Sequence, residues 1–289
     1  MRYLVVVLFS ALWSSAFIAG KIGAAELDPF SLLGWRYGVS VLLLLPWAWP
    51  RQPGLVSAAL TLGLLNNGLY LGLTFAALPL LSPATVIVIV STAPFLTALL
   101  AAALGLERIR PGQVLGMAIG FAGVLLLVGP AALDGASALG VALAGAGTLA
   151  FAGGTLFYRR HLLGFAPVTV NFWQSLAGLA LLAPLALWWG GAPRAVTTEL
   201  VLVVLYLALV VTIGGMALWL WLIRSSGAAT AASYHLLNPF FAVLLSHLAF
   251  GSPVTMVDGV GGALVALGLL LAARVPAASA LRPARGSGT

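Results

Sequence analysis

Residues 228–250 read AATAASYHLLNPFFAVLLSHLAF and contain no Asp, Glu, Lys or Arg. About 20 apolar residues make a helix long enough to cross a lipid bilayer. The whole chain has this character, because 62% of its 289 residues are hydrophobic and only 7% are charged. Soluble domains carry about a quarter charged residues. The sequence therefore predicts an all-α membrane protein.

Apolar runs bounded by charges, Pro and Gly predict ten transmembrane helices. Their limits are 3–22, 30–49, 55–77, 82–104, 112–130, 138–157, 166–189, 199–223, 228–250 and 254–273. An even number of spans puts both chain ends on one side of the membrane. Ten of the 13 basic residues then lie on that side, namely Arg2, Arg51, Arg108, Arg110, Arg159, Arg160, Arg224, Arg274, Arg282 and Arg285. The positive-inside rule identifies this side as the cytoplasm, so we expect both termini there.

The same distribution accounts for the net charge of +7, and we expect no nucleic-acid partner. The chain has no Cys, which excludes disulfides and thiolate metal sites. No motif for a metal or a cofactor stands out, and we predict neither.

The two halves of the chain resemble each other. An offset of 138 residues pairs Pro29, Trp35 and Pro46 with Pro167, Trp173 and Pro184, and an offset of 145 pairs Pro94, Gly116 and Gly123 with Pro239, Gly261 and Gly268. Each half holds five spans, an odd number, so the second half enters the membrane in the opposite orientation. The sequence predicts two five-helix inverted-topology repeats, at 1–130 and 138–275, followed by a disordered cytoplasmic tail at 276–289.

Pro94 and Pro239 lie near the middle of spans four and nine, at equivalent positions of the two repeats. A proline within a helix removes one backbone hydrogen bond and clashes with the preceding turn. The two prolines are therefore either static kinks or hinges of a moving gate.

Tyr234, His235 and Asn238 can share one face of span nine, because residues three and four apart are neighbours on a helix. Polar side chains at membrane depth face the bundle interior or a wet cavity, since lipid would leave them unsatisfied. They form either an interhelical packing patch or the wall of a substrate cavity, and the nearby proline favours the cavity.

Other spans carry similar candidates for the cavity wall. They are Trp13 in span one, Asn67 and Tyr70 in span three, and Trp173 and Gln174 in span seven. Aromatic rings with a few amides suit an amphipathic organic solute rather than an inorganic ion. Trp219 and Trp221 lie near the end of span eight, where tryptophans more often sit at the membrane interface.

Carboxylates are absent from the middle of the predicted spans. A drug/proton antiporter usually needs a membrane-embedded carboxylate, so multidrug cation exchange is disfavoured. Lys21 and Arg36 lie near the outer ends of spans one and two and could attract a substrate carboxylate at the cavity mouth. Arg36 could instead extend outward or pair with Glu26 or Asp28.

Glycines recur in the last span of each half, as in GMAIGFAG at 116–123. Such spacing lets helices approach closely. We expect spans five and ten to pack within one chain, which favours a monomer, with a homodimer contact as the alternative.

These features together resemble the EamA branch of the drug/metabolite transporter superfamily. The resemblance rests on Trp13, Phe17 and Lys21 in span one, on Pro29 and Arg36 in span two, and on TAPFLTALLAAALGLERI at 92–109, and it covers nearly the whole chain. The second half repeats the pattern in NPFFAVLLSHLAFGSPVT at 238–255, where Ser252 takes the place equivalent to Glu107.

The resemblance implies ten helices around a central cavity in the bacterial cytoplasmic membrane. It also implies export of small metabolites by alternating access, with amino acids first. The aromatic and amide side chains make aromatic or large apolar amino acids plausible cargo. The alternatives are another metabolite or drug-like solute and, from other classes, a channel or a membrane-embedded enzyme. No HExxH or Gly-x-Ser-x-Gly motif supports an enzyme.

Overall fold

The computed structural model describes residues 2–49, 52–77, 80–81, 83–129, 135–190, 196–251 and 253–273. Its α-helices are α1 Arg2–Gly23, α2 Pro29–Leu44, α3 Leu55–Gly63, α4 Leu71–Ala77, α5 Pro83–Val90, α6 Ala93–Ala103, α7 Pro111–Val128, α8 Ala138–His161, α9 Pro167–Trp189, α10 Thr198–Tyr206, α11 Met216–Ser226, α12 Ala228–Ser233, α13 Asn238–Phe250 and α14 Met256–Ala273. Short 3-10 helices are η1 Leu45–Trp47 and η5 Tyr234–Leu237, and π-helices are η2 Leu64–Tyr70 and η4 Leu207–Gly215. Ser252 and the predicted tail at 276–289 lie outside the described residues.

The positions of the predicted spans agree with the structure to within a few residues. Within the described ranges, nine helical stretches are long and apolar enough to cross a membrane. The last predicted span corresponds to a shorter apolar helix, Met256–Ala272 within α14. The count of ten spans therefore stays a prediction at this one segment.

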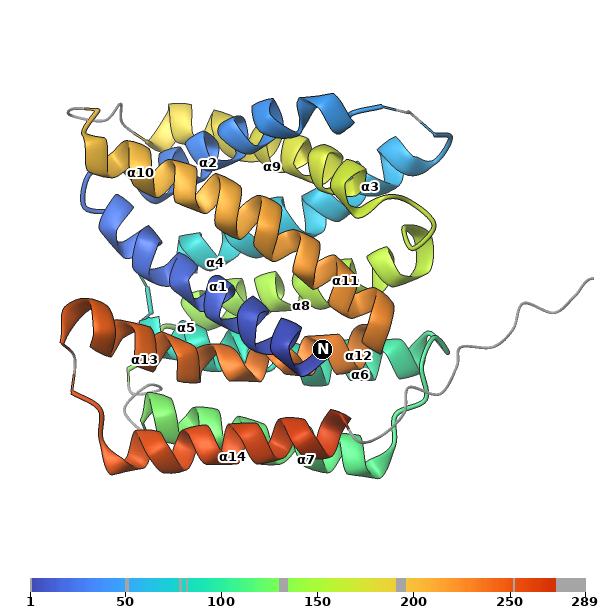
Figure 1. Ribbon diagram of the computed structural model, residues 1–289, viewed down its shortest axis with the longest axis vertical. Helices are drawn as coiled ribbons and strands as arrows, with labels where there is room; N and C mark the ends of the chain where they lie inside the picture. Colours follow the sequence, from blue (N-terminus) through green and yellow to red (C-terminus); the bar gives the residue numbers. More distant parts are fainter. Residues whose placement is uncertain are drawn as a thin grey trace, which may run out of the picture.

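The helices form a bundle in which equivalent members of the two halves lie side by side. Figure 1 shows α7 and α14 together at one edge of the bundle and α2 with α9 at the opposite edge. The start of α1 and the end of α14 lie at the same end of the bundle, called the N-terminal end below (Figure 1).

Glycines allow α7 and α14 to touch backbone to backbone. A Cβ atom at Gly116 would lie 2.5 Å from the backbone nitrogen of Ala272, and one at Gly123 would lie 2.5 Å from the carbonyl oxygen of Gly261. Since later residues of α7 meet earlier residues of α14, the two helices run antiparallel. The glycine pattern thus supports packing within the chain.

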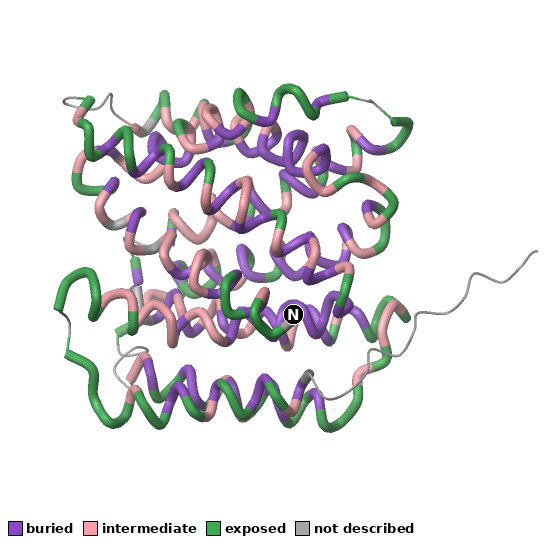
Figure 2. The backbone as a smooth tube through the Cα atoms, in the orientation of Figure 1, coloured by how far each residue is buried: buried purple, intermediate pink, exposed green. Residues whose placement is uncertain are grey.

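Buried residues concentrate in the interior of the bundle, where Figure 2 shows the inward sides of the helices as buried. Large apolar side chains also cover its outside, with Leu187 87% exposed and Leu99 66% exposed. Such side chains would face water in a soluble protein and face hydrocarbon in a membrane protein. The surface therefore agrees with a lipid surrounding.

The two halves are tied together at the N-terminal end by Glu107, which follows α6. Its carboxylate oxygens accept hydrogen bonds from the backbone nitrogens of Ala228 at 2.6 Å and Ala229 at 3.1 Å. Arg159, in the last turn of α8, lies 3.8 Å away. A negative charge at the start of α12 is favourable because the backbone N–H groups there lack partners within the helix.

Candidate functional site

Four spans are interrupted near their middles. Spans three and eight each contain a π-helical segment, η2 and η4, and the offset of 145 that relates the halves places 64–70 on 209–215. Span four breaks at Ser91 and Thr92, between α5 and α6, and span nine breaks at η5. π-Helical segments within α-helices often mark functional sites. The interruptions identify the middle of the bundle as the region to analyse.

Pro94 and Pro239 each lie in the first turn of the helix that follows a break, α6 or α13. Proline is tolerated there, because the first turn of a helix needs no intrahelical N–H partner. The hydroxyl of Ser14 in α1 donates to the backbone oxygen of Asn238 at 2.9 Å, beside Pro239. The structure thus places a helix break beside each proline, and their role as hinges stays a prediction.

His235 is surrounded by aromatic rings from three other spans. Its ring centroid lies 5.1 Å from Phe9, 5.2 Å from Trp13, 5.1 Å from Phe151 and 4.6 Å from Trp219, all in edge-on geometry. Tyr70 extends the group, with its ring 4.8 Å from that of Phe151. We call these six residues the aromatic cluster: Phe9, Trp13, Tyr70, Phe151, Trp219 and His235.

The aromatic cluster and the adjoining Asn238 contain polar atoms without a protein partner. Asn238 Nδ2 lies 2.9 Å from His235 Nδ1, which leaves His235 Nε2 and Asn238 Oδ1 buried and unbonded. Trp219 Nε1 is likewise buried and unbonded. A buried polar group without a partner costs about 1–3 kcal/mol, so such groups usually meet water or a ligand.

The orientation of these groups determines what they could bind. With Nδ1 accepting from Asn238, His235 carries its proton on Nε2, an assignment that follows from the hydrogen-bond network. His235 and Trp219 then each offer an N–H donor, and Asn238 offers an acceptor. Two donors suit a carboxylate or carbonyl, an acceptor suits an amine, and the rings suit an apolar body.

A second buried group links four spans by hydrogen bonds, and we call it the polar chain: Arg36, Asn67, Asn171, Gln174 and Thr212. Asn67 Nδ2 donates to the backbone oxygen of Gln174 at 2.9 Å, and Gln174 Nε2 donates to Asn171 Oδ1 at 2.9 Å. Asn171 Nδ2 donates to the backbone oxygen of Thr212 at 2.9 Å. The polar chain joins both π-helical segments to α9.

Arg36 ends the polar chain, with its Nε 2.6 Å from Thr212 Oγ1. Glu26 and Asp28, the two acidic residues proposed as partners of Arg36, make other contacts. Glu26 accepts a hydrogen bond from Thr197 Oγ1, and Asp28 caps the start of α2. The structure places Arg36 against η4 rather than extended outward. The side chain of Lys21 lies outside the described residues, so the predicted pair of mouth charges stays a prediction.

The remaining predicted residues are buried but separate. The hydroxyl of Tyr234 lies 3.2 Å from Ser226 Oγ, toward the N-terminal end of the bundle and away from Asn238. The ring of Trp173 packs edge-on against Phe172 at 5.0 Å. The structure therefore brings Trp13, His235 and Asn238 together, joins Asn67 to Gln174, and assigns Tyr234 and Trp173 other neighbours.

Sequence reasoning missed part of the site. Trp219 was expected at the membrane interface, yet it is fully buried beside His235. Phe9 precedes Trp13 by one helical turn, and Phe151 is the equivalent of Trp13 at the offset of 138. These two relations to Trp13 could have identified Phe9 and Phe151 from the sequence. Nothing local in the sequence marked Asn171. Among the described residues, no group of His, Cys, Asp and Glu could hold a metal ion.

Comparisons with known proteins extend over nearly the whole chain. The model of the EamA-like transporter family matches residues 1–129 and again residues 138–274. An uncharacterized transporter of Archaeoglobus fulgidus is 26% identical over 279 residues, covering 93% of this chain and 96% of the relative. The uncharacterized inner membrane transporter YedA of Escherichia coli K12 is 29% identical over 245 residues, covering 81% and 78%.

One solved crystal structure has the same fold. It superposes with a TM-score of 0.79 at 23% sequence identity, covering 94% of this chain and 97% of that one.

Proposed function

The chain belongs to the EamA-like transporter family, and from this premise we propose that it exports small metabolites across the cytoplasmic membrane of a bacterium. Amino acids are the foremost candidates, and aromatic or large apolar ones best match the site. Transport proceeds by alternating access through a cavity centred on the aromatic cluster. Another amphipathic metabolite of similar size is the alternative cargo.

The unbonded polar atoms of the aromatic cluster and of the adjoining Asn238 carry this proposal. The N–H groups of His235 and Trp219 would bind the cargo's carboxylate, and Asn238 Oδ1 would accept from its amine. The rings of Phe9 and Trp13 would contact its side chain. The cluster is closed in this structure, so binding requires the surrounding helices to separate.

The arrangement of the halves supports alternating access. Equivalent helices run antiparallel, as in α7 and α14, and the equivalent spans are interrupted at equivalent places. These features fit two inverted five-helix repeats that move about the breaks near Pro94 and Pro239. We also propose cytoplasmic termini, because the basic residues concentrate on that side. The name of the relative YedA, an inner membrane transporter, supports the choice of membrane.

Counterflow in proteoliposomes tests the proposal. Vesicles loaded with one unlabelled amino acid should accumulate that amino acid in labelled form, with saturation, for aromatic and large apolar members. Folded protein that exchanges no amino acid would refute the amino-acid assignment. Conductance without saturation would indicate a channel instead.

Substitutions then test the site. His235→Ala and Asn238→Ala should each raise the half-saturating concentration or abolish exchange, whereas Leu187→Ala on the outer surface should leave it unchanged. If both site variants fold and exchange normally, the cluster serves packing alone.

A further inference from the structure

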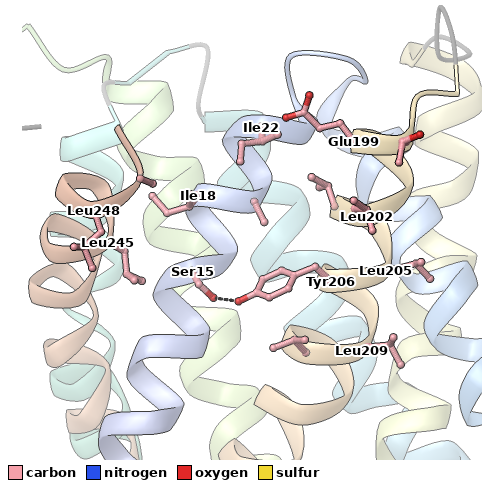
Figure 3. A pocket seen from close by; sticks show the side chains of 15 residues that line it. Ser15, Ile18, Ile22, Glu199, Leu202, Leu205, Tyr206, Leu209, Leu245 and Leu248 are labelled. Atoms are coloured by element: carbon pink, nitrogen blue, oxygen red, sulfur yellow. Dashed lines mark hydrogen bonds between the residues drawn. The ribbon is translucent and has the colours of Figure 1, made fainter. Parts of the chain in front are cut away.

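A groove of about 990 Å³ runs along the outside of the bundle, at the end away from the start of α1. Figure 3 shows it between α1, the segment formed by α10 and η4, and α13. Apolar side chains line most of it, among them Leu202, Leu245 and Leu248. Leu202 is 61% exposed and Leu248 is 72% exposed, so the groove opens sideways, toward the space that lipid fills.

A hydrogen bond joins two walls of the groove. Ser15 Oγ of α1 and Tyr206 OH of α10 lie 2.7 Å apart, and Leu209 lines the groove further along (Figure 3). Beyond Ser15, the neighbouring Ser14 is bonded to Asn238 and Trp13 packs against His235. The groove therefore lies next to the aromatic cluster but is separated from it.

The outer end of the groove carries negative charge. Glu199, in the first turn of α10, is exposed at the groove mouth (Figure 3). The carboxylate of Glu26 is held near this end by Thr197, two residues earlier in the chain. Among the residues that the structure describes, no Lys or Arg lines the groove, and the side chain of Lys21 lies outside that description. The mouth therefore favours a cationic group.

The length of the groove suits a chain that starts at the membrane surface. From Glu199 to Tyr206 the helical segment advances about 10 Å, at about 1.5 Å per residue. The charged mouth and the apolar wall below it match the two regions of one leaflet. The mouth corresponds to the headgroup region and the wall to the hydrocarbon region.

We propose that the groove binds one acyl chain of a phospholipid whose headgroup carries a primary amine. The chain lies against the leucines, and the amine lies near Glu199. The lipid belongs to the leaflet opposite the N-terminus. A transported solute is the less suitable occupant, because the walls offer a solute's polar groups few partners.

Lipid quenching of a single fluorophore tests this site without any assay of transport. The chain has no Cys, so Leu202→Cys provides one labelling position in the groove. Labelled protein is placed in phosphatidylcholine bilayers with increasing fractions of brominated phosphatidylethanolamine or brominated phosphatidylglycerol of the same chains. The same label at Leu187→Cys, exposed at the end of α9, reports the surrounding bilayer.

We expect the label at residue 202 to be quenched at a two- to fivefold lower fraction of the ethanolamine lipid, the range that an exposed ion pair supplies. Glu199→Gln should remove this preference, and Ala249→Trp, which fills the groove, should weaken quenching by both lipids. The label at residue 187 should respond equally to the two lipids.

Equal quenching by both lipids at residue 202 would overturn the proposal, as would a preference that survives Glu199→Gln. A preference of the same size at residue 187 would assign the effect to the bilayer and overturn it too. Displacement of both lipids by dodecylamine, without an ethanolamine preference, would make a soluble amine the occupant.

Discussion

Replacing Glu107 by Gln should open the N-terminal end of the bundle. The Glu107 carboxylate accepts two backbone hydrogen bonds from α12, at 2.6 and 3.1 Å, and lies 3.8 Å from Arg159. Hydrogen bonds to charged groups contribute about 1.5–3 kcal/mol each, whereas neutral ones contribute about 1 kcal/mol. Gln keeps one acceptor oxygen but loses the charge. We therefore expect the free energy that favours the closed over the open N-terminal end to fall by about 2 kcal/mol.

A loss of about 2 kcal/mol corresponds to an increase of about 30-fold in the fraction of molecules open at this end. Ala101 is fully buried beneath the contact, in a cluster with Leu156 and Ala228. In the cysteine-free chain, Ala101→Cys would be the one thiol. Its labelling by a membrane-impermeant maleimide should accelerate about 30-fold when Glu107→Gln is added.

The control is Glu199→Gln, which removes a carboxylate at the opposite end of the bundle and should leave the labelling rate unchanged. A labelling rate for Glu107→Gln within about twofold of the parent would refute the reasoning. A similar acceleration with Glu199→Gln would show general loosening rather than opening at Glu107. Melting temperatures of all variants should be measured, so that global unfolding is recognised.

Three further predictions concern packing, the polar chain and the site. Gly116→Ala should lower the unfolding free energy by about 1–3 kcal/mol, because the added methyl group would meet the α14 backbone. Gly259→Ala, where a Cβ atom would meet nothing within 4 Å, should leave the denaturation midpoint in detergent unchanged. Equal losses of stability in the two variants would contradict the close contact at Gly116. Thr212→Val should cost about 1.5–3 kcal/mol in the same measurement, because it removes the acceptor of Arg36 Nε, and an unchanged midpoint would mean that water replaces it. Trp219→Phe keeps the ring and removes the N–H, so the half-saturating cargo concentration should rise about tenfold, and an unchanged value would exclude this donor from binding.

Spans were predictable from the sequence because a bilayer imposes a local requirement. Each crossing needs a run of apolar residues that satisfies its own backbone, and such runs stand out in the sequence. The helix breaks near Pro94 and Pro239 followed for the same reason, since proline acts on its own turn. The family was also predictable, because its motifs are short and local, and the match to the family model confirms it.

Side-chain partners were harder to predict. The hydrophobic pattern that marks the inward face of a soluble helix is weak here, because lipid is as apolar as the protein interior. Tyr234 and His235 are adjacent in the sequence, yet their side chains have different neighbours. The hydroxyl of Tyr234 bonds to Ser226, whereas the ring of His235 lies in the aromatic cluster. Trp219 was assigned by its distance from the span end, whereas packing against Phe9 buries it.

The sequence by itself determined that this chain lies in a membrane, where its helices run, where spans four and nine are interrupted, and to which family it belongs. Only the tertiary structure decided which side chains meet. Phe9, Phe151, Trp219 and His235 come from four spans, and their contact depends on how those spans rotate and pack against one another. The groove beside α1 has the same origin, because it exists where α10 and α13 diverge and no residue pattern within a single helix encodes that separation.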